Sequence, residues 1–183
     1  MVLNIFGRKK SSPVIVVCGH TGAGVSSIVN SIVGSNVAKV APSRAGASTT
    51  IKAVHYPASF SGRNFEVYDM PGFDSLDVKG RDAIFPPSPN LVIICTQDNA
   101  RKAKVTANHV KQHRRYDSVP VILVSLQHDQ DQPQPQGNWW ATTGNAAFGV
   151  MPNVRAREVV TMTGMDTTRT HLRTLISQNC TSP

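Results

Sequence analysis

The sequence predicts an α/β protein with a doubly wound, mostly parallel sheet of six strands, one of which is an antiparallel edge strand. Short aliphatic runs alternate with longer amphipathic segments along the chain. A glycine-rich turn, Gly19–Gly24, directly follows the first aliphatic run. The chain has 183 residues with 40% hydrophobic content, which suffices for one such domain with a buried core.

The expected strands differ in their hydrophobic pattern. The first, fourth and fifth are continuous aliphatic runs, which is typical of parallel strands covered on both faces. The second and third alternate more and are joined by a turn-rich segment, so they predict a hairpin at the edge of the sheet. In order, the six strands are expected at Val14–Cys18, Ile51–Tyr56, Asn64–Tyr68, Leu91–Cys95, Pro120–Leu126 and Glu158–Met162, with Pro57–Gly62 as the hairpin connection.

Helices are expected between these strands. In the first helix, Ile28 and Ile32 recur at helical spacing and form an apolar face. Long loops are expected at 72–90, which holds three prolines, and at Gln127–Gly137, which is low in complexity. Residues 1–12 form a basic leader that is expected to be flexible, so 13–183 is predicted as a single domain. The expected helices are Gly24–Val33, Ala100–Tyr116, Trp139–Phe148 and Thr167–Ser177.

Composition narrows the class of protein. The formal net charge of +8 favours a polyanionic partner, such as a nucleotide, a nucleic acid or an acidic lipid. Nucleic acid is disfavoured because no aromatic residues are interleaved with the basic clusters. No apolar run approaches the length of a transmembrane helix. The three cysteines lack metal-ligand spacing, which indicates a reducing compartment and predicts a cytoplasmic protein.

The turn after the first strand matches the phosphate-binding pattern G-x-x-x-x-G-K-[ST] at every defining position except one. Gly19, Gly24 and Ser26 are present, but Val25 occupies the lysine position. The glycines allow backbone N–H groups to point at phosphate oxygens, and the following helix adds its positive N-terminal dipole. The hydroxyl of Ser26 stands where such loops ligate Mg²⁺. The loop therefore predicts nucleotide binding without its usual cationic side chain.

Two further motifs follow at suitable distances. Asp69-Met-Pro-Gly72 closes the third expected strand. Upstream, Ser48-Thr-Thr50 lies in a loop rich in glycine and hydroxyl groups. A threonine in such a loop can close over Mg²⁺ when the γ-phosphate is present, and Thr50 is the first candidate for this role and Thr49 the second. Their alternative interpretations are a turn aspartate for Asp69 and ordinary loop hydroxyls for the threonines.

With these motifs in this order, the chain resembles a small GTPase of the translation-factor-related class, near the Era, septin and immune-associated GTPases. It is similar in particular to the compact G-domain proteins of fungi. The resemblance extends from about Pro13 to Ser177 and includes Asn138-Trp-Trp and Val159-Val-Thr-Met-Thr163. It implies a P-loop G domain that binds GTP or GDP with Mg²⁺ and hydrolyses GTP to GDP and phosphate as a molecular switch.

The resemblance also implies roles for individual residues. Thr50, Asp69 and Gly72 are expected to sense the γ-phosphate in catalysis, and Ser26, Thr50 and Asp69 to hold the metal. Asp129 is expected to read the guanine base, with a plain loop acid as the alternative, and the Thr161–Gly164 loop, through Thr163, to pack on the base. The nucleotide-binding set is Gly19, Thr21, Gly22, Ala23, Gly24, Val25, Ser26, Ser27, Asp129 and Thr163.

Three positions depart from the family pattern. Loss of the loop lysine at Val25 removes a charge-assisted contact of about 1.5–3 kcal/mol, for which Lys52, Arg44 or Lys79 are candidate replacements. The base-reading N-K-x-D becomes Leu126-Gln-His-Asp129, and Phe73 replaces a water-orienting glutamine, which predicts slow turnover. The alternative hypothesis is a pseudo-GTPase scaffold with little or no hydrolysis. Expected partners are a protein effector or a second copy in a nucleotide-dependent homodimer.

Overall fold

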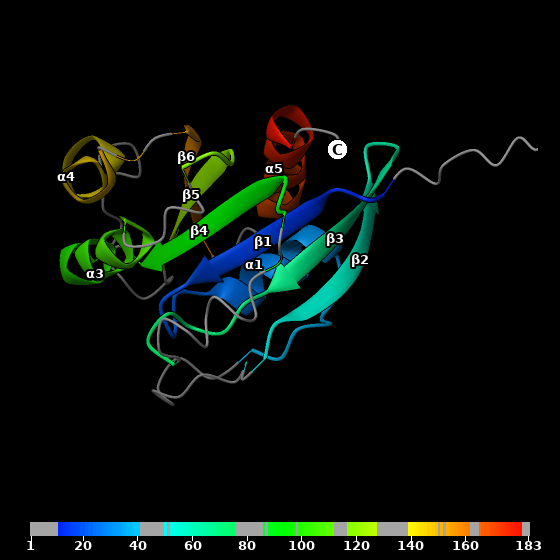
Figure 1. Ribbon diagram of the computed structural model, residues 1–183, viewed down its shortest axis with the longest axis horizontal. Helices are drawn as coiled ribbons and strands as arrows, with labels where there is room; N and C mark the ends of the chain where they lie inside the picture. The colour runs from blue at the N-terminus through cyan, green and yellow to red at the C-terminus, as the bar shows by residue number, and fades with distance from the viewer. Residues whose placement is uncertain are drawn as a thin grey trace, which may run out of the picture.

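A computed structural model describes residues 11–40, 50, 52–75, 86, 88–97, 99–111, 117–127, 139–149, 151, 153–161 and 165–180. Its strands form one sheet in the order β2-β3-β1-β4-β5-β6, in which only the β2–β3 pair is antiparallel (Figure 1). The predicted fold class is confirmed. The strands are β1 (Val14–Gly19), β2 (Val54–Phe60), β3 (Arg63–Asp69), β4 (Leu91–Gln97), β5 (Val121–Gln127) and β6 (Val154–Thr161).

Helices cover both faces of this sheet. They are α1 (Val25–Val33), α3 (Ala100–Lys111), the π-helical turn η2 (Trp140–Gly144), α4 (Asn145–Phe148) and α5 (Met165–Asn179). Alternate residues of β1 point to opposite faces, so Ile15 and Val17 pack with α1 and α5, whereas Val16 and Cys18 pack with α3 and α4. β1, β4 and β5 are thus buried on both sides, as their continuous aliphatic pattern predicted.

The edge hairpin differs from the prediction. The segment from Pro57 to Phe60 belongs to β2 instead of forming a connection, and only Ser61 and Gly62 make the turn. Both turn residues have positive φ, 51° and 70°, which suits the right-handed twist of a two-residue hairpin turn. Proline is tolerated in β2 because this strand lies at the edge of the sheet.

Other boundaries shift for local reasons. β6 begins at Val154, four residues earlier than expected. Its exposed Arg155 and Arg157 alternate with inward residues, a pattern that an edge strand tolerates but that does not look like a buried strand in the sequence. The expected helix Trp139–Phe148 starts as a π-turn, where a Cβ on Gly144 would lie 2.2 Å from the Trp140 ring. Within the described parts of the chain, no helix combines the length and apolarity needed to cross a membrane.

Several predicted segments lie outside the described residues. These are residues 1–10 of the leader, most of the loops 72–90 and 127–137, the end of the helix expected to reach Tyr116, and Ile51 and Met162 at the limits of expected strands.

Candidate functional site

The loop between β1 and α1 turns at two glycines. Gly22 and Gly24 adopt positive φ values of 78° and 85°, and the N–H of Ala23 donates to the carbonyl of His20 at 2.9 Å. Gly24 directly precedes α1, and a Cβ at that position would lie 2.2 Å from Cδ2 of Leu126. Glycine is therefore required at Gly24 both by conformation and by the approach of β5.

Val25 begins α1 and turns its side chain into the protein. It is 8% exposed and belongs to the core cluster between the sheet and α1. At the position where related loops carry a lysine, this chain offers a phosphate only the main-chain N–H groups of the loop and the first turn of the helix.

The three predicted metal-binding residues meet at one point. The hydroxyl of Ser26 donates to Oδ2 of Asp69 at 2.9 Å, and the hydroxyl of Thr50 donates to the same oxygen at 3.3 Å. The Ser26 and Thr50 hydroxyl oxygens are 3.5 Å apart. Ser26 comes from α1, Asp69 from the end of β3 and Thr50 from the segment before β2, so tertiary structure assembles this cluster.

Asp69 is strongly buried. Its side chain is 2% exposed, and its other carboxylate oxygen, Oδ1, makes no hydrogen bond among the described residues. Burial raises the pKa of Asp69, although the hydrogen bonds from Ser26 and Thr50 partly offset this rise. A buried carboxylate oxygen without a partner, beside two hydroxyls, fits a hard cation such as Mg²⁺, which prefers oxygen ligands and also relies on substrate phosphates and water.

The segment after Asp69 folds back onto the loop. Oδ1 of Asp74 accepts hydrogen bonds from the Thr21 N–H at 2.8 Å and from the Thr21 hydroxyl at 2.6 Å. Gly72 lies so close that a Cβ on it would meet the Thr21 hydroxyl at 2.2 Å. The N–H of Phe73 donates to the carbonyl of Gly19 at 2.9 Å, and its side chain is 5% exposed. Phe73 is thus a core residue that holds this segment against the loop.

His20 extends this contact on the side of α3. Its Nδ1 is 3.2 Å from Oδ1 of Asp74, and its ring meets that of His109 edge-on with centroids 5.5 Å apart. Burial lowers the pKa of His20, and the attraction of Asp74 only partly reverses that effect. His20 thus contacts α3 and Asp74.

Sequence reasoning did not assign roles to two residues at this site. Asp74 lies two residues after Gly72 of the D-x-P-G motif and accepts hydrogen bonds from the N–H and the hydroxyl of Thr21. Gln97 ends β4, and its Nε2 donates to the carbonyl of Gly22 at 2.6 Å. The signal that could have revealed Gln97 is a polar residue directly after an aliphatic run, because the carboxyl ends of parallel strands line the ligand-binding edge.

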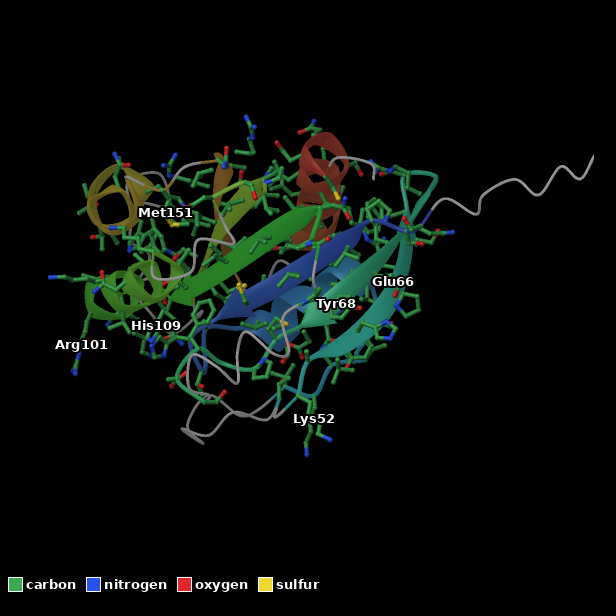
Figure 2. The ribbon with its side chains drawn as sticks, in the orientation of Figure 1. Lys52, Glu66, Tyr68, Arg101, His109 and Met151 are labelled. Atoms are coloured by element: carbon green, nitrogen blue, oxygen red, sulfur yellow. The ribbon has the colours of Figure 1, made fainter. Side chains whose placement is uncertain are left out.

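The remaining candidates have different outcomes. Leu126, in the base-reading motif, is 3% exposed and packs against the loop. Lys52 is exposed, and Figure 2 shows its side chain projecting from the edge of the molecule. Trp139 and Trp140 are half-buried and pack against the core beside α3 and α4. Asp129, Thr163, Ser48, Thr49, Arg44 and Lys79 lie outside the described residues.

The geometry of this loop agrees with the likeness of the chain to known proteins. A sequence model of the family described as 50S ribosome-binding GTPase matches residues 14–140. The chain belongs to this GTPase family. The family is one of GTP-binding proteins with a P-loop G domain, so guanine nucleotide is the ligand that membership implies.

Two curated proteins illustrate the relationship. GTPase Der of Paenarthrobacter aurescens (strain TC1) is 30% identical over 129 residues, which are 67% of this chain and 26% of that protein. Translation initiation factor IF-2 of Zymomonas mobilis subsp. mobilis is 26% identical over 129 residues, which are 70% of this chain and 12% of that protein. This chain therefore aligns with about a quarter or less of the length of these relatives.

Solved structures share its fold. Era in complex with MgGDPNP and a segment of 16S ribosomal RNA superposes with a TM-score of 0.69 at 15% identity, covering 95% of this chain and 58% of that one. The Arl6 BBS3 small GTPase from Trypanosoma brucei, with bound GppNp, gives a TM-score of 0.61 at 14% identity, covering 92% of this chain and 99% of that one. At these identities the likeness establishes the fold.

Proposed function

We propose that this protein binds GDP and GTP with Mg²⁺ and hydrolyses GTP slowly to GDP and phosphate, acting as a molecular switch. The observation that supports this best is the meeting of Ser26, Thr50 and Asp69 beside the phosphate-binding loop. These residues come from three separate segments, and packing alone gives no reason for a buried carboxylate among them.

Phosphate binding would rest on the main chain. The loop from Gly19 to Ser27 presents N–H groups at the start of α1, where the helix dipole favours negative charge. Gly22, Gly24 and Val25 would contribute through their backbone N–H groups. The N–H groups of Thr21 and Ala23 donate to Asp74 and to the carbonyl of His20, so these two residues would contribute only when nucleotide displaces those contacts. Without the loop lysine we expect weaker binding, in the micromolar range.

The cluster at Asp69 would hold the metal. The Ser26 hydroxyl is the proposed direct ligand, Asp69 would act directly or through water, and Thr50 would complete the set when GTP is present. Bound Mg²⁺ would neutralise charge on the phosphates and help to align them. Gly72 would report the γ-phosphate through its N–H, because it already lies against Thr21 of the loop.

Slow turnover is proposed because of Phe73. Its side chain is buried and apolar, so it cannot orient an attacking water in the way that a glutamine does. Catalysis would then come from positioning and from electrostatic stabilisation by the loop and the metal cluster.

The alternative proposal is a pseudo-GTPase scaffold, which buried Val25, Leu126 and Phe73 favour because each has exchanged a polar role for a packing role. Guanine reading by Asp129 and base packing by Thr163 also stay predictions. A cytoplasmic location, a family relationship to the fungal G-domain proteins, and a homodimer or a protein effector as partner also stay predictions.

Two measurements separate these proposals. Calorimetry with GDP, GTP and ATP in the presence of Mg²⁺ should give heat with the guanine nucleotides only. Phosphate release from GTP should then fall to background in Asp69→Ala but not in Asp166→Ala, a matched control whose carboxylate lies on α5 and pairs with Arg169 at 3.1 Å. Nucleotide binding without Asp69-dependent release would favour the scaffold. No binding at all would refute the proposed switch and also favour the scaffold.

A further inference from the structure

A lysine from α3 is connected to the phosphate-binding loop through one side chain. The ammonium of Lys102 donates a hydrogen bond to Oε1 of Gln97, and Nε2 of Gln97 donates to the carbonyl of Gly22 at 2.6 Å. Asn99 fixes the start of α3 by accepting a hydrogen bond from the N–H of Lys102 at 3.2 Å. The first turn of α3 therefore holds a positive charge next to a phosphate-binding loop that has valine, Val25, at its lysine position.

The position of this charge runs against the local preference of the helix. The first turn of α3 contains Arg101 and Lys102 and no acidic residue, although the helix dipole disfavours cations there. Exceptions to local rules of this kind concentrate at functional sites. Arg101 points away from the molecule in Figure 2, whereas Lys102 is directed to Gln97 and the loop.

Electrostatics also connect Lys102 to the loop. The pKa of His20 is lowered first by burial, then by His109 and by Lys102. The field of Lys102 thus reaches a residue inside the phosphate-binding loop. Of the three candidates that the sequence offered for a replacement cation, only Lys52 lies within the described residues, and its side chain projects from the edge of the molecule (Figure 2).

We propose that Lys102 is the cation that contacts the nucleotide phosphates in place of the missing loop lysine, and that Gln97 is the residue that positions it. This inference rests on the proposed nucleotide binding. Lys102 is exposed and has a flexible four-carbon stem, so its ammonium can exchange the neutral amide of Gln97 for a multiply charged phosphate. A charge-assisted contact to phosphate is stronger than one to a neutral amide.

The test compares Lys102→Ala with Lys104→Ala by calorimetry against GTP, GDP and guanosine, with Mg²⁺ present. Lys104 is an exposed lysine on the same helix, so it controls for the change in net charge. We expect Lys102→Ala to weaken GDP binding about tenfold, GTP binding at least as much, and guanosine binding not at all. Lys102→Arg should recover most of the affinity. Thermal melting should show Lys102→Ala as stable as the wild type, because a cation is removed from the first turn of α3.

A second variant tests whether Lys102 replaces the loop lysine. Val25→Lys restores the family residue, and in that background Lys102→Ala should change GDP affinity less than about twofold. Gln97→Ala should weaken GDP binding in the wild-type background and leave guanosine binding unchanged.

The outcomes distinguish this inference from the function on which it rests. If the wild type, Lys102→Ala and Lys104→Ala all bind GDP equally well, the role of Lys102 is refuted while nucleotide binding stands. An equal loss for guanosine and GDP would also refute it, because the effect would then not involve phosphate. If the wild type binds no guanine nucleotide, the proposed function and this inference fail together.

Discussion

The packing of Leu126 against the phosphate-binding loop gives the sharpest stability prediction. Gly22 and Gly24 both adopt positive φ, where an alanine costs about 1–2 kcal/mol. A Cβ on Gly22 would meet nothing within 4 Å, whereas a Cβ on Gly24 would lie 2.2 Å from Cδ2 of Leu126. Overpacking of a buried site costs about 1–3 kcal/mol more. Gly22→Ala should therefore lower the free energy of unfolding by about 1 kcal/mol, and Gly24→Ala by about 3 kcal/mol.

Urea denaturation followed by circular dichroism measures this difference, with Gly22→Ala as the matched control. With a urea m-value of about 2 kcal/mol per molar, the midpoint for Gly24→Ala should lie about 1 M below that for Gly22→Ala. In a Leu126→Ala background the clash is removed, so the excess cost of Gly24→Ala should shrink. Equal losses for the two glycines, or an excess that persists without Leu126, would refute the assignment of Leu126 as a packing residue of the loop.

Three further predictions concern titration and thiol reactivity. Burial lowers the pKa of His20 below its usual 6.5, so the unfolded chain takes up the proton first and the free energy of unfolding should fall as the pH drops through 6.5. The urea midpoints at pH 7.5 and pH 5.5 should therefore differ less in His20→Gln than in the wild type. Burial raises the pKa of Asp74, but the hydrogen bonds from Thr21 outweigh this effect and the pKa is lowered below 3.8. Asp74→Asn should therefore destabilise the protein near pH 7, and the difference in stability from the wild type should vanish as the pH falls below 3.8. A difference in stability that stays constant across pH would contradict this prediction. Burial raises the pKa of Cys180 to about 11, and Cys18 and Cys95 are also buried, so an aromatic disulfide reagent at pH 8 should label all three thiols only in urea; fast labelling of the native protein would show that this burial is wrong.

The fold was largely predictable because its signals are local. The aliphatic runs of β1, β4 and β5 and the Gly19–Ser26 pattern identify buried parallel strands with a phosphate-binding turn. The errors lie where local signals conflict with position in the sheet. Pro57 suggested the end of a strand but lies within the edge strand β2, and Arg155 and Arg157 hid the first half of β6. Edge strands tolerate both kinds of residue, and their position at an edge is not visible in a short window of sequence.

For the site, the sequence by itself determined which chemical groups are available. It supplied the glycines that let the loop turn, the hydroxyls of Ser26 and Thr50, the carboxylate of Asp69, and the absence of a lysine at Val25. These follow from motif and spacing, because backbone conformation and residue chemistry act locally.

Only the tertiary structure decided how these groups meet. It brought Ser26, Thr50 and Asp69 into contact, buried Val25 and Phe73 in the core, and linked Lys102 through Gln97 to the carbonyl of Gly22. Gln97 and Gly22 are 75 residues apart in the chain, and the parallel pairing of β1 with β4 brings their carboxyl ends to one edge of the sheet. Contacts of this kind depend on strand order, which no local pattern encodes.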